Sequence, residues 1–101
     1  MIERTFTPIV QRALDASIAF LQNQISAKDY VSIFDDIIAN DDEGETSQGT
    51  HAEAFETVHE WIALYNPDPE LRAGNDHLIN EEELRRHVSD FLTTLGVTQE
   101  R

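Results

Sequence analysis

The apolar residues recur at the spacing of an α-helix in four separate segments, and this pattern constrains the fold more than any other feature. In the first segment they recur at steps of three or four residues and form a stripe of Val10, Leu14, Ile18, Leu21 and Ile25. Ala13 and Phe20 widen this stripe on one side, and Ser17, which lies between them, is small enough to be tolerated there. The other stripes comprise Tyr30, Phe34, Ile37 and Ile38; Phe55, Val58, Ile62 and Tyr65; and Leu84, Val88, Phe91, Leu92 and Leu95. We therefore expect an all-α protein.

Residues suited to helix ends lie beside each stripe. Thr7 followed by Pro8 fits the N-cap and first positions of a helix. A capping-box spacing, in which a capping residue is followed three positions later by an acid, precedes the other three stripes. These pairs are Ser26 with Asp29, Thr50 with Glu53, and Asn80 with Glu83. The second helix is expected to stop near Asn40, and Gly96 can terminate the last one.

The chain length favours one domain over residues 1–101. A domain of 101 residues buries a little over ~60% of the surface that its unfolded chain exposes, which is enough for one modest core. No strand-like alternation competes with the helical pattern, and no repeat of solenoid period occurs. The expected architecture is a single-domain bundle of four antiparallel helices around one core.

Acidic residues are concentrated in one part of the chain. The sequence contains 20 acidic and 7 basic side chains, and its net charge is -13. Between Lys28 and Arg72 lie 43 residues with 12 Asp or Glu and no Lys or Arg. A solvated surface is the simplest interpretation of these acids. The segment contains no Lys or Arg, however, so salt bridges within it cannot relieve the repulsion among its carboxylates. The charge therefore favours a basic protein partner and excludes direct binding of nucleic acid.

The composition also narrows the cellular setting and the chemistry. Cysteine is absent, so disulfides, thiolate metal sites and cysteine nucleophiles are excluded. The N-terminal stretch "MIERTFTPIVQ" has neither a basic region followed by an apolar run nor any other mark of a signal peptide. Nothing approaches the ~18 apolar residues of a membrane span. We expect a cytoplasmic protein without a membrane partner.

The stretch "DHLINEEEL" resembles the end of a calcium-binding EF-hand loop. If Ile79 takes loop position eight and Glu83 position twelve, Arg72 falls at position one and His77 at the position that requires glycine. A cation would then stand where calcium needs an anion. Acids that favour the dipole at a helix N-terminus explain "NEEE" better, so we expect no metal ion or cofactor.

Catalysis is also weakly supported. The four histidines, which have no recognisable ligand spacing, are His51, His59, His77 and His87. Carboxylate pairs are plentiful in any acidic protein, whereas a hydrolase must raise the pKa of one of them by burial. We expect a protein that is not an enzyme. A calcium-binding or other regulatory helical module and a small hydrolase remain as alternative classes.

The most distinctive stretch is "YNPDPELR", which lies between the third and fourth stripes. It reads Tyr65, Asn66, Pro67, Asp68, Pro69, Glu70, Leu71 and Arg72. Together with "FLQNQISAKDYVSIF", "AFETVHEWIALYNPDPELR" and "INEEELRRHVSDFL", it resembles the colicin D-type immunity family. These are small helical proteins that neutralise tRNA-cleaving bacteriocins or contact-dependent toxins. The resemblance covers most of the chain, roughly residues 20–95.

The resemblance implies an inhibitor whose acidic side chains occupy the nuclease cleft of a cognate toxin, expected to be a tRNase, in place of RNA phosphates. Asp68 matches a toxin-facing acid and Glu70 another, and Tyr65 ends the third helix as the family's motif requires. Independently of the family, Pro67 and Pro69 stiffen the turn and lower the ordering cost of presenting both acids.

The sequence departs from the family's pattern at two positions. Asn66 and Ala63 stand where an immunity protein of this type can carry glutamates. Glu60, one turn before Ala63, and Asp76, in the following loop, could compensate for them. The predicted toxin-binding residues are therefore Tyr65, Asn66, Asp68, Glu70, Glu60 and Asp76.

Overall fold

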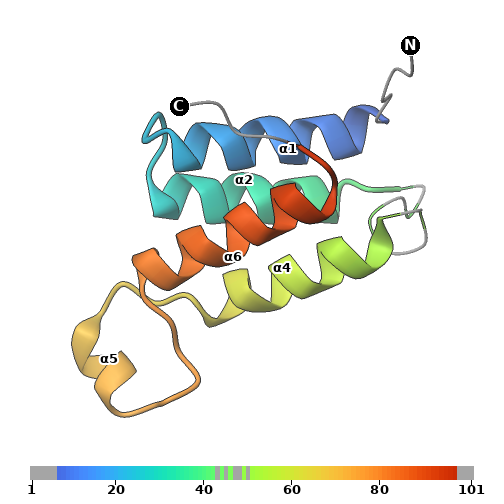
Figure 1. Cartoon of the computed structure of the whole chain (residues 1–101). Helices are drawn as coiled ribbons and strands as arrows, with labels where there is room; N and C mark the ends of the chain where they lie inside the picture. The colour runs from blue at the N-terminus through green and yellow to red at the C-terminus, as the bar shows by residue number, and fades with distance from the viewer. Residues whose placement is uncertain (1–6, 43, 45, 47–48, 50, 98–101) are drawn as a thin grey trace.

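Four long helices and one short helix make up the secondary structure of the part of the chain that the computed structural model describes, which is residues 7–42, 44, 46, 49 and 51–97. They are α1 (Pro8–Leu21), α2 (Ala27–Ala39), α4 (Ala52–Leu64), α5 (Pro69–Ala73) and α6 (Glu81–Thr94), as Figure 1 shows. These residues contain no strand, and an isolated bridge pairs Tyr65 with Ile79. The prediction of an all-α protein is confirmed.

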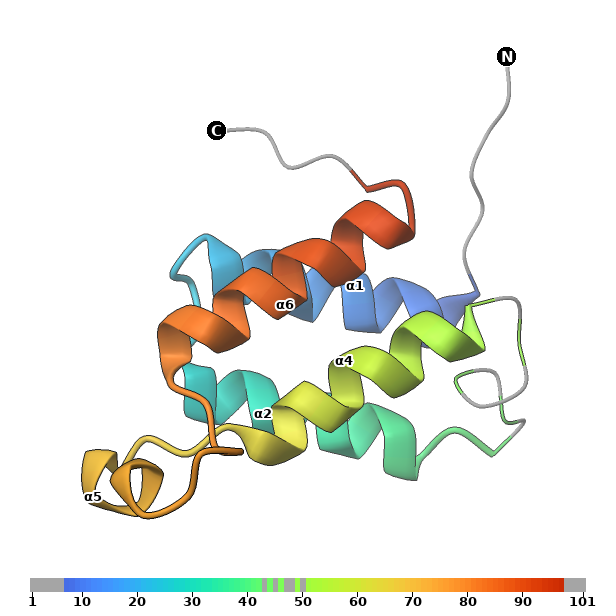
Figure 2. The ribbon, with the colours of Figure 1, turned by 60° about the horizontal axis from the view of Figure 1, so that its bottom comes forward.

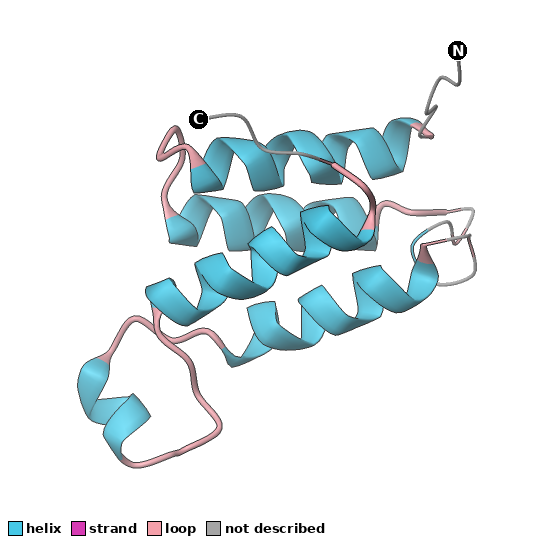
Figure 3. Ribbon diagram, in the orientation of Figure 1, coloured by secondary structure: helices cyan, strands magenta, loops and turns pink. Residues whose placement is uncertain are grey.

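The long helices pack against one another in a compact body. Helix α1 packs against α2 and α6, and α4 packs against α6 (Figures 1 and 2). The radius of gyration, 13.9 Å, is close to the ~13 Å of a compact domain of 100 residues. Helix α5 lies apart from this body, on the loop that joins α4 to α6 (Figure 3).

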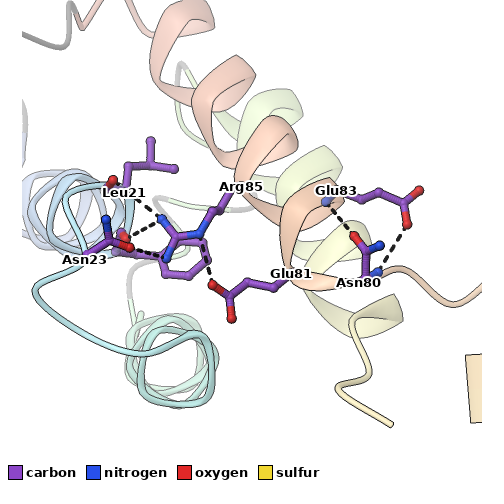
Figure 4. Close-up of polar contacts among 7 residues, drawn as sticks. Leu21, Asn23, Asn80, Glu81, Glu83 and Arg85 are labelled. Atoms are coloured by element: carbon purple, nitrogen blue, oxygen red, sulfur yellow. Dashed lines mark hydrogen bonds and ion pairs between the residues drawn. The ribbon is translucent and has the colours of Figure 1, made fainter. Parts of the chain in front are cut away.

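Three of the predicted helix starts are confirmed by their hydrogen bonds. The Thr7 hydroxyl accepts a hydrogen bond from the Val10 amide at 3.4 Å, and the Ser26 hydroxyl accepts one from the Asp29 amide at 3.1 Å. At the start of α6, the Asn80 side chain accepts from the Glu83 amide while the Glu83 carboxylate accepts from the Asn80 amide (Figure 4). These bonds satisfy amides that have no partner within the helix.

The start of α4 differs from the prediction. Thr50 lies outside the described residues, and His51 occupies the N-cap position without a side-chain capping bond. The predicted ends agree better, because Asn40 is the C-cap of α2 and Gly96 follows α6 with a φ of 78°. Glycine adopts this left-handed conformation without a steric penalty, and the Val97 amide then donates to the Leu92 carbonyl at 2.9 Å.

The stripes of α2, α4 and α6 form the core as predicted, although Ile38 and Tyr65 are only half-buried. At its centre Phe34 contacts three other rings, with centroid distances of 5.8 Å to Tyr30, 5.9 Å to Phe55 and 6.2 Å to Phe91. Such tilted and edge-on ring pairs add stabilisation beyond the area that they bury. The core is therefore joined across α2, α4 and α6 by aromatic contacts.

The buried face of α1 combines Val10 and Leu14 of the predicted stripe with the residues that were expected to widen it on one side. Ala13, Ser17 and Phe20 are fully buried, whereas the far end of the stripe, Ile18 and Leu21, is half-buried. Ile25, which continued the stripe, lies beyond the end of α1 and is also half-buried. The first part of the predicted stripe is therefore confirmed, and burial then continues along the side of Ala13, Ser17 and Phe20 rather than along Ile18 and Leu21.

Ser17 is more than a tolerated small residue. Its hydroxyl donates to the Ala13 carbonyl at 2.8 Å and lies 2.8 Å from the Tyr30 hydroxyl. Burial raises the pKa of the Tyr30 phenol well above its ordinary value, and the hydrogen bond with Ser17 opposes this only partly. Tyr30 thus stays protonated and donates to Ser17, so both buried hydroxyl groups are satisfied.

Arg85 of α6 holds the C-terminal end of α1 (Figure 4). Its guanidinium donates to the Phe20 carbonyl at 2.9 Å and to the Asn23 side-chain oxygen at 2.8 Å, and it lies 4.4 Å from the centroid of the Phe20 ring. Glu81 accepts a third bond at 3.0 Å. Asn23 has a φ of 63°, a left-handed conformation that asparagine tolerates better than most residues. Arg85 therefore ties α6 to the turn between α1 and α2.

We expect Arg85→Met to lower the free energy of unfolding by about 1–3 kcal/mol, because charge-assisted hydrogen bonds to α1 are lost while the apolar stem is retained. Arg85→Lys should recover only part of this loss, since an ammonium cannot reproduce the planar fork. The measurement is urea unfolding, with the exposed neighbour Arg86→Met as control. Equal destabilisation at both positions would contradict the proposed role of Arg85.

Candidate functional site

The candidate site is the loop that joins α4 to α6, here called the α4–α6 loop and defined as residues 65–80. It carries α5 and projects beyond the ends of α4 and α6 in both ribbon views (Figures 1 and 2). It contains four of the six predicted toxin-binding residues within one turn, and Asp76 further on. The sixth residue, Glu60, lies on α4.

The two ends of the loop are joined at its base. The Ile79 amide donates to the Leu64 carbonyl at 2.9 Å, and the Asn66 amide donates to the Ile79 carbonyl at 3.0 Å. Ile79 itself is buried in the core, with only 4% of its surface exposed. The position of the loop is consequently fixed with respect to the helices.

Within the loop, successive side chains cap the backbone that follows them. The Asn66 side chain accepts from the Asp68 amide, and the Asp68 carboxylate accepts from the Glu70 amide, each at 2.9 Å. The Arg72 guanidinium returns to the Asn66 carbonyl at 2.7 Å. With the φ angle of Pro67 also fixed, these bonds restrict the segment before any partner binds.

Helix α5 was not predicted, although the sequence contains its signal. Asp68 is its N-cap and Pro69 its first residue, the same kind of pair as Thr7 and Pro8 at the start of α1. Its five residues are too few for an apolar stripe, so the sequence pattern indicates a turn here. Asp68 therefore has a local structural role in addition to any role in binding.

The four connected residues of the loop differ in how much of their surface is exposed. Asp68 and Glu70 are both exposed, and one Asp68 oxygen accepts the capping bond. Tyr65 and Asn66 are half-buried. Burial raises the pKa of the Tyr65 phenol, the negative charge of Glu81 raises it further, and Arg72 opposes the shift. The phenol stays protonated at neutral pH and remains a hydrogen-bond donor.

The remaining two predicted residues are less closely connected with this unit. Glu60 is exposed on α4 and Asp76 is exposed after α5. Hydrogen bonds of the loop connect Asn66, Asp68 and Glu70, and Tyr65 directly precedes Asn66 in the chain. Among the described residues, no hydrogen bond joins the side chain of Glu60 or Asp76 to these four.

Two of the four histidines, His59 and His87, pack against aromatic rings. The His59 ring lies 3.1 Å from an Asp35 oxygen and stacks on Phe34 at a centroid distance of 6.1 Å, and His87 stacks on Trp61 at 3.8 Å. Over the residues that are described, no group of three or more His, Asp or Glu side chains is arranged to hold a metal ion. A search of those same residues finds no helix with the length and apolar character needed to cross a membrane.

Sequence reasoning missed three features near the acidic residues. Arg72 braces the loop from within, and the apolar side chain of Val31 on α2 lies beside Tyr65 at its base. The acid Asp41 is also more than a loop charge, because its carboxylate accepts two bonds from Thr46, at 2.7 Å from the amide and 2.6 Å from the hydroxyl. Val31 and Tyr65 belong to distant segments, so no local sequence signal reports their proximity, whereas the bonds of Arg72 and Asp41 join residues only six and five positions apart.

No similarity to a known protein emerged from three comparisons: no protein-family model matches the chain, and neither a curated protein nor a solved structure is similar to it.

Proposed function

We propose that this protein is an immunity protein that binds and inhibits a basic nuclease toxin, a tRNase of a bacteriocin or contact-dependent system. In this proposal residues 1–101 form a single-domain, antiparallel four-helix bundle that presents the α4–α6 loop. Asp68 and Glu70 enter the toxin's active site in place of RNA phosphates. The protein performs no catalysis itself and needs no cofactor.

The observation that supports the proposal most strongly is that an ordered loop carries the two exposed carboxylates. Asp68 and Glu70 lie on a loop that is closed at its base by backbone bonds and braced by Asn66 and Arg72. Because the loop is already ordered, little conformational entropy is lost when it binds. Rigid presentation of anions is what an inhibitor of a cationic nuclease cleft requires.

The charge distribution supports a basic partner in the same way. Helices α2 and α4 carry exposed acids and contribute no Lys or Arg after Lys28. These exposed acids are Asp29, Asp35, Asp36, Glu53, Glu56 and Glu60. Such a field attracts cationic surfaces over a distance of about one Debye length and repels RNA itself.

The direct test is an inhibition assay with the basic C-terminal domain of a toxin encoded beside this reading frame. Purified protein should form a stoichiometric complex with that domain and stop its cleavage of tRNA. A toxin from an unrelated system serves as the control and should remain active. Cleavage that continues at a large excess of the protein, together with no complex in gel filtration, would reject the proposed function.

Electrostatic steering gives a second prediction for the same complex. Raising the ionic strength from about 0.01 to 0.1 M shortens the Debye length from about 30 to 10 Å. We expect the association rate constant to fall by about tenfold, with a smaller change in the dissociation rate constant, because exposed charges act mainly before contact. Stopped-flow fluorescence measures both constants. An association rate that salt does not change would remove steering as a role of the acidic surface.

A further inference from the structure

A hollow of ≈ 530 Å³ lies between the beginning of α2 and the base of the α4–α6 loop. Its walls are formed by Lys28 and Val31, which lie three residues apart on α2, and by Tyr65 and Pro67. Three residues apart on a helix means that both side chains lie on the same face. The volume falls within the ~300–1,000 Å³ of sites that accept small molecules or anchoring side chains.

Three of the four residues that line the hollow are uncharged, and Lys28 is the fourth. Val31 is half-buried and Pro67 is exposed, and neither carries a charge. The Tyr65 phenol is neutral, as described above. Lys28 is exposed on the α2 side, whereas Asp68 and Glu70 follow Pro67 along the loop.

This arrangement of charges restricts the occupant. A cationic side chain in the hollow would meet Lys28, and an acidic one would approach the most acidic part of the chain. A large uncharged side chain avoids both conflicts. An aromatic ring gains more than an aliphatic chain, because the Lys28 ammonium can lie against its face and because aromatic residues are frequent anchors at protein interfaces.

We propose that this hollow receives an aromatic side chain of a basic protein partner, and that Lys or Arg residues next to that aromatic residue contact Asp68 and Glu70. The inference rests on the proposed function, which identifies the partner as the toxin. It adds an uncharged contact to a protein–toxin interface that the proposed function explains by charge alone. The anchor supplies apolar burial, whereas the acids supply register and rate.

Two synthetic peptides test the hollow without the toxin. The first is acetyl-Lys-Arg-Trp-Arg-Lys-amide, and the second has alanine in place of the tryptophan, so their charges are equal. Titration of the ¹⁵N-labelled full chain should show at least ~5-fold tighter binding of the tryptophan peptide, because a ring buries apolar area that a methyl group cannot. The amide signals of Val31 and Asn66 should shift with that peptide. Equal affinities for the two peptides overturn the proposal.

Substitutions in the protein test whether the preference for the tryptophan peptide arises at the hollow. Val31→Arg places a guanidinium in the hollow and should reduce the affinity for the tryptophan peptide to that for the alanine peptide. Ile33→Arg is the matched control, because Ile33 lies on the same helix, is 36% exposed and does not line the hollow. Circular dichroism establishes that both variants are folded. If Val31→Arg does not fold, Lys28→Ala, at an exposed position, takes its place and should weaken the preference by ~2-fold or more. An unchanged preference in the folded variant contradicts the assignment.

The inhibition assay separates this inference from the proposed function. Inhibition of the toxin together with equal peptide affinities would reject the aromatic anchor and leave the proposed function intact. A preference for the tryptophan peptide without inhibition would reject the toxin as partner and leave the hollow as a site for aromatic, basic segments.

Discussion

Replacing Phe34 by alanine is expected to lower the free energy of unfolding by ~3–5 kcal/mol, the usual range for a fully buried phenylalanine. Phe34 has no exposed surface, and its ring contacts Tyr30, Phe55 and Phe91. The substitution removes apolar burial and leaves a cavity bounded by α2, α4 and α6. Because the free energy of unfolding of a small domain is only ~5–15 kcal/mol, this loss is a large part of the total stability. Urea unfolding followed by circular dichroism measures the change.

Ile33→Ala provides the control on the same helix. Ile33 is 36% exposed, so we expect its truncation to cost clearly less than that of Phe34. If the two substitutions cost the same, the ring cluster is not the centre of the core. A spectrum dominated by β-structure in the unmodified protein would instead overturn the helical assignment altogether.

Helix boundaries and most of the core were predictable because they depend on local patterns. The reciprocal bonds of Asn80 with Glu83, and the buried positions Leu84, Val88 and Leu92, follow from spacing within a single helix. The burial of Ser17 at the centre of the α1 face was harder to predict. Ser17 is buried because its hydroxyl meets Tyr30 on another helix, and a periodicity of apolar residues does not include such a contact.

In the α4–α6 loop, too, the order of the residues was predictable from the sequence, whereas most of their contacts were not. The motif correctly placed Tyr65, Asn66, Asp68 and Glu70 next to one another after the third long helix, because they are neighbours in the chain, although Glu70 lies in α5 rather than in a turn. It did not reveal the bond from Arg72 to the Asn66 carbonyl or the hollow that α2 forms beside Tyr65. The prolines had already indicated a stiff turn, but the bond within the loop has no sequence signal, and the hollow arises only when α2 packs beside the loop.

Asp68→Asn is expected to weaken toxin binding by ~2 kcal/mol or more, about 30-fold in Kd, while leaving the stability of the free protein nearly unchanged. Asparagine is as good an N-cap as aspartate, so the bond to the Glu70 amide that begins α5 can be retained. The substitution removes the charge and keeps the size. The loss of affinity comes from a cationic group of the toxin that is left buried and unpaired in the complex. Isothermal titration calorimetry of the variant with the toxin domain measures it.

The choice of control decides what this experiment can establish. Asp41→Asn is unsuitable, because the Asp41 carboxylate accepts two bonds from Thr46 and the change would disturb that segment. Asp42→Asn removes the same charge at an exposed position beyond the C-terminal end of α2, whereas the hollow and the α4–α6 loop lie near its beginning. We expect it to change mainly the association rate, by less than ~2-fold, and to leave the dissociation rate nearly unaltered. Equal, small effects of the two substitutions would mean that the acids act only as a diffuse field. A large effect of Asp68→Asn on dissociation, absent in Asp42→Asn, is the result that the proposed contact requires.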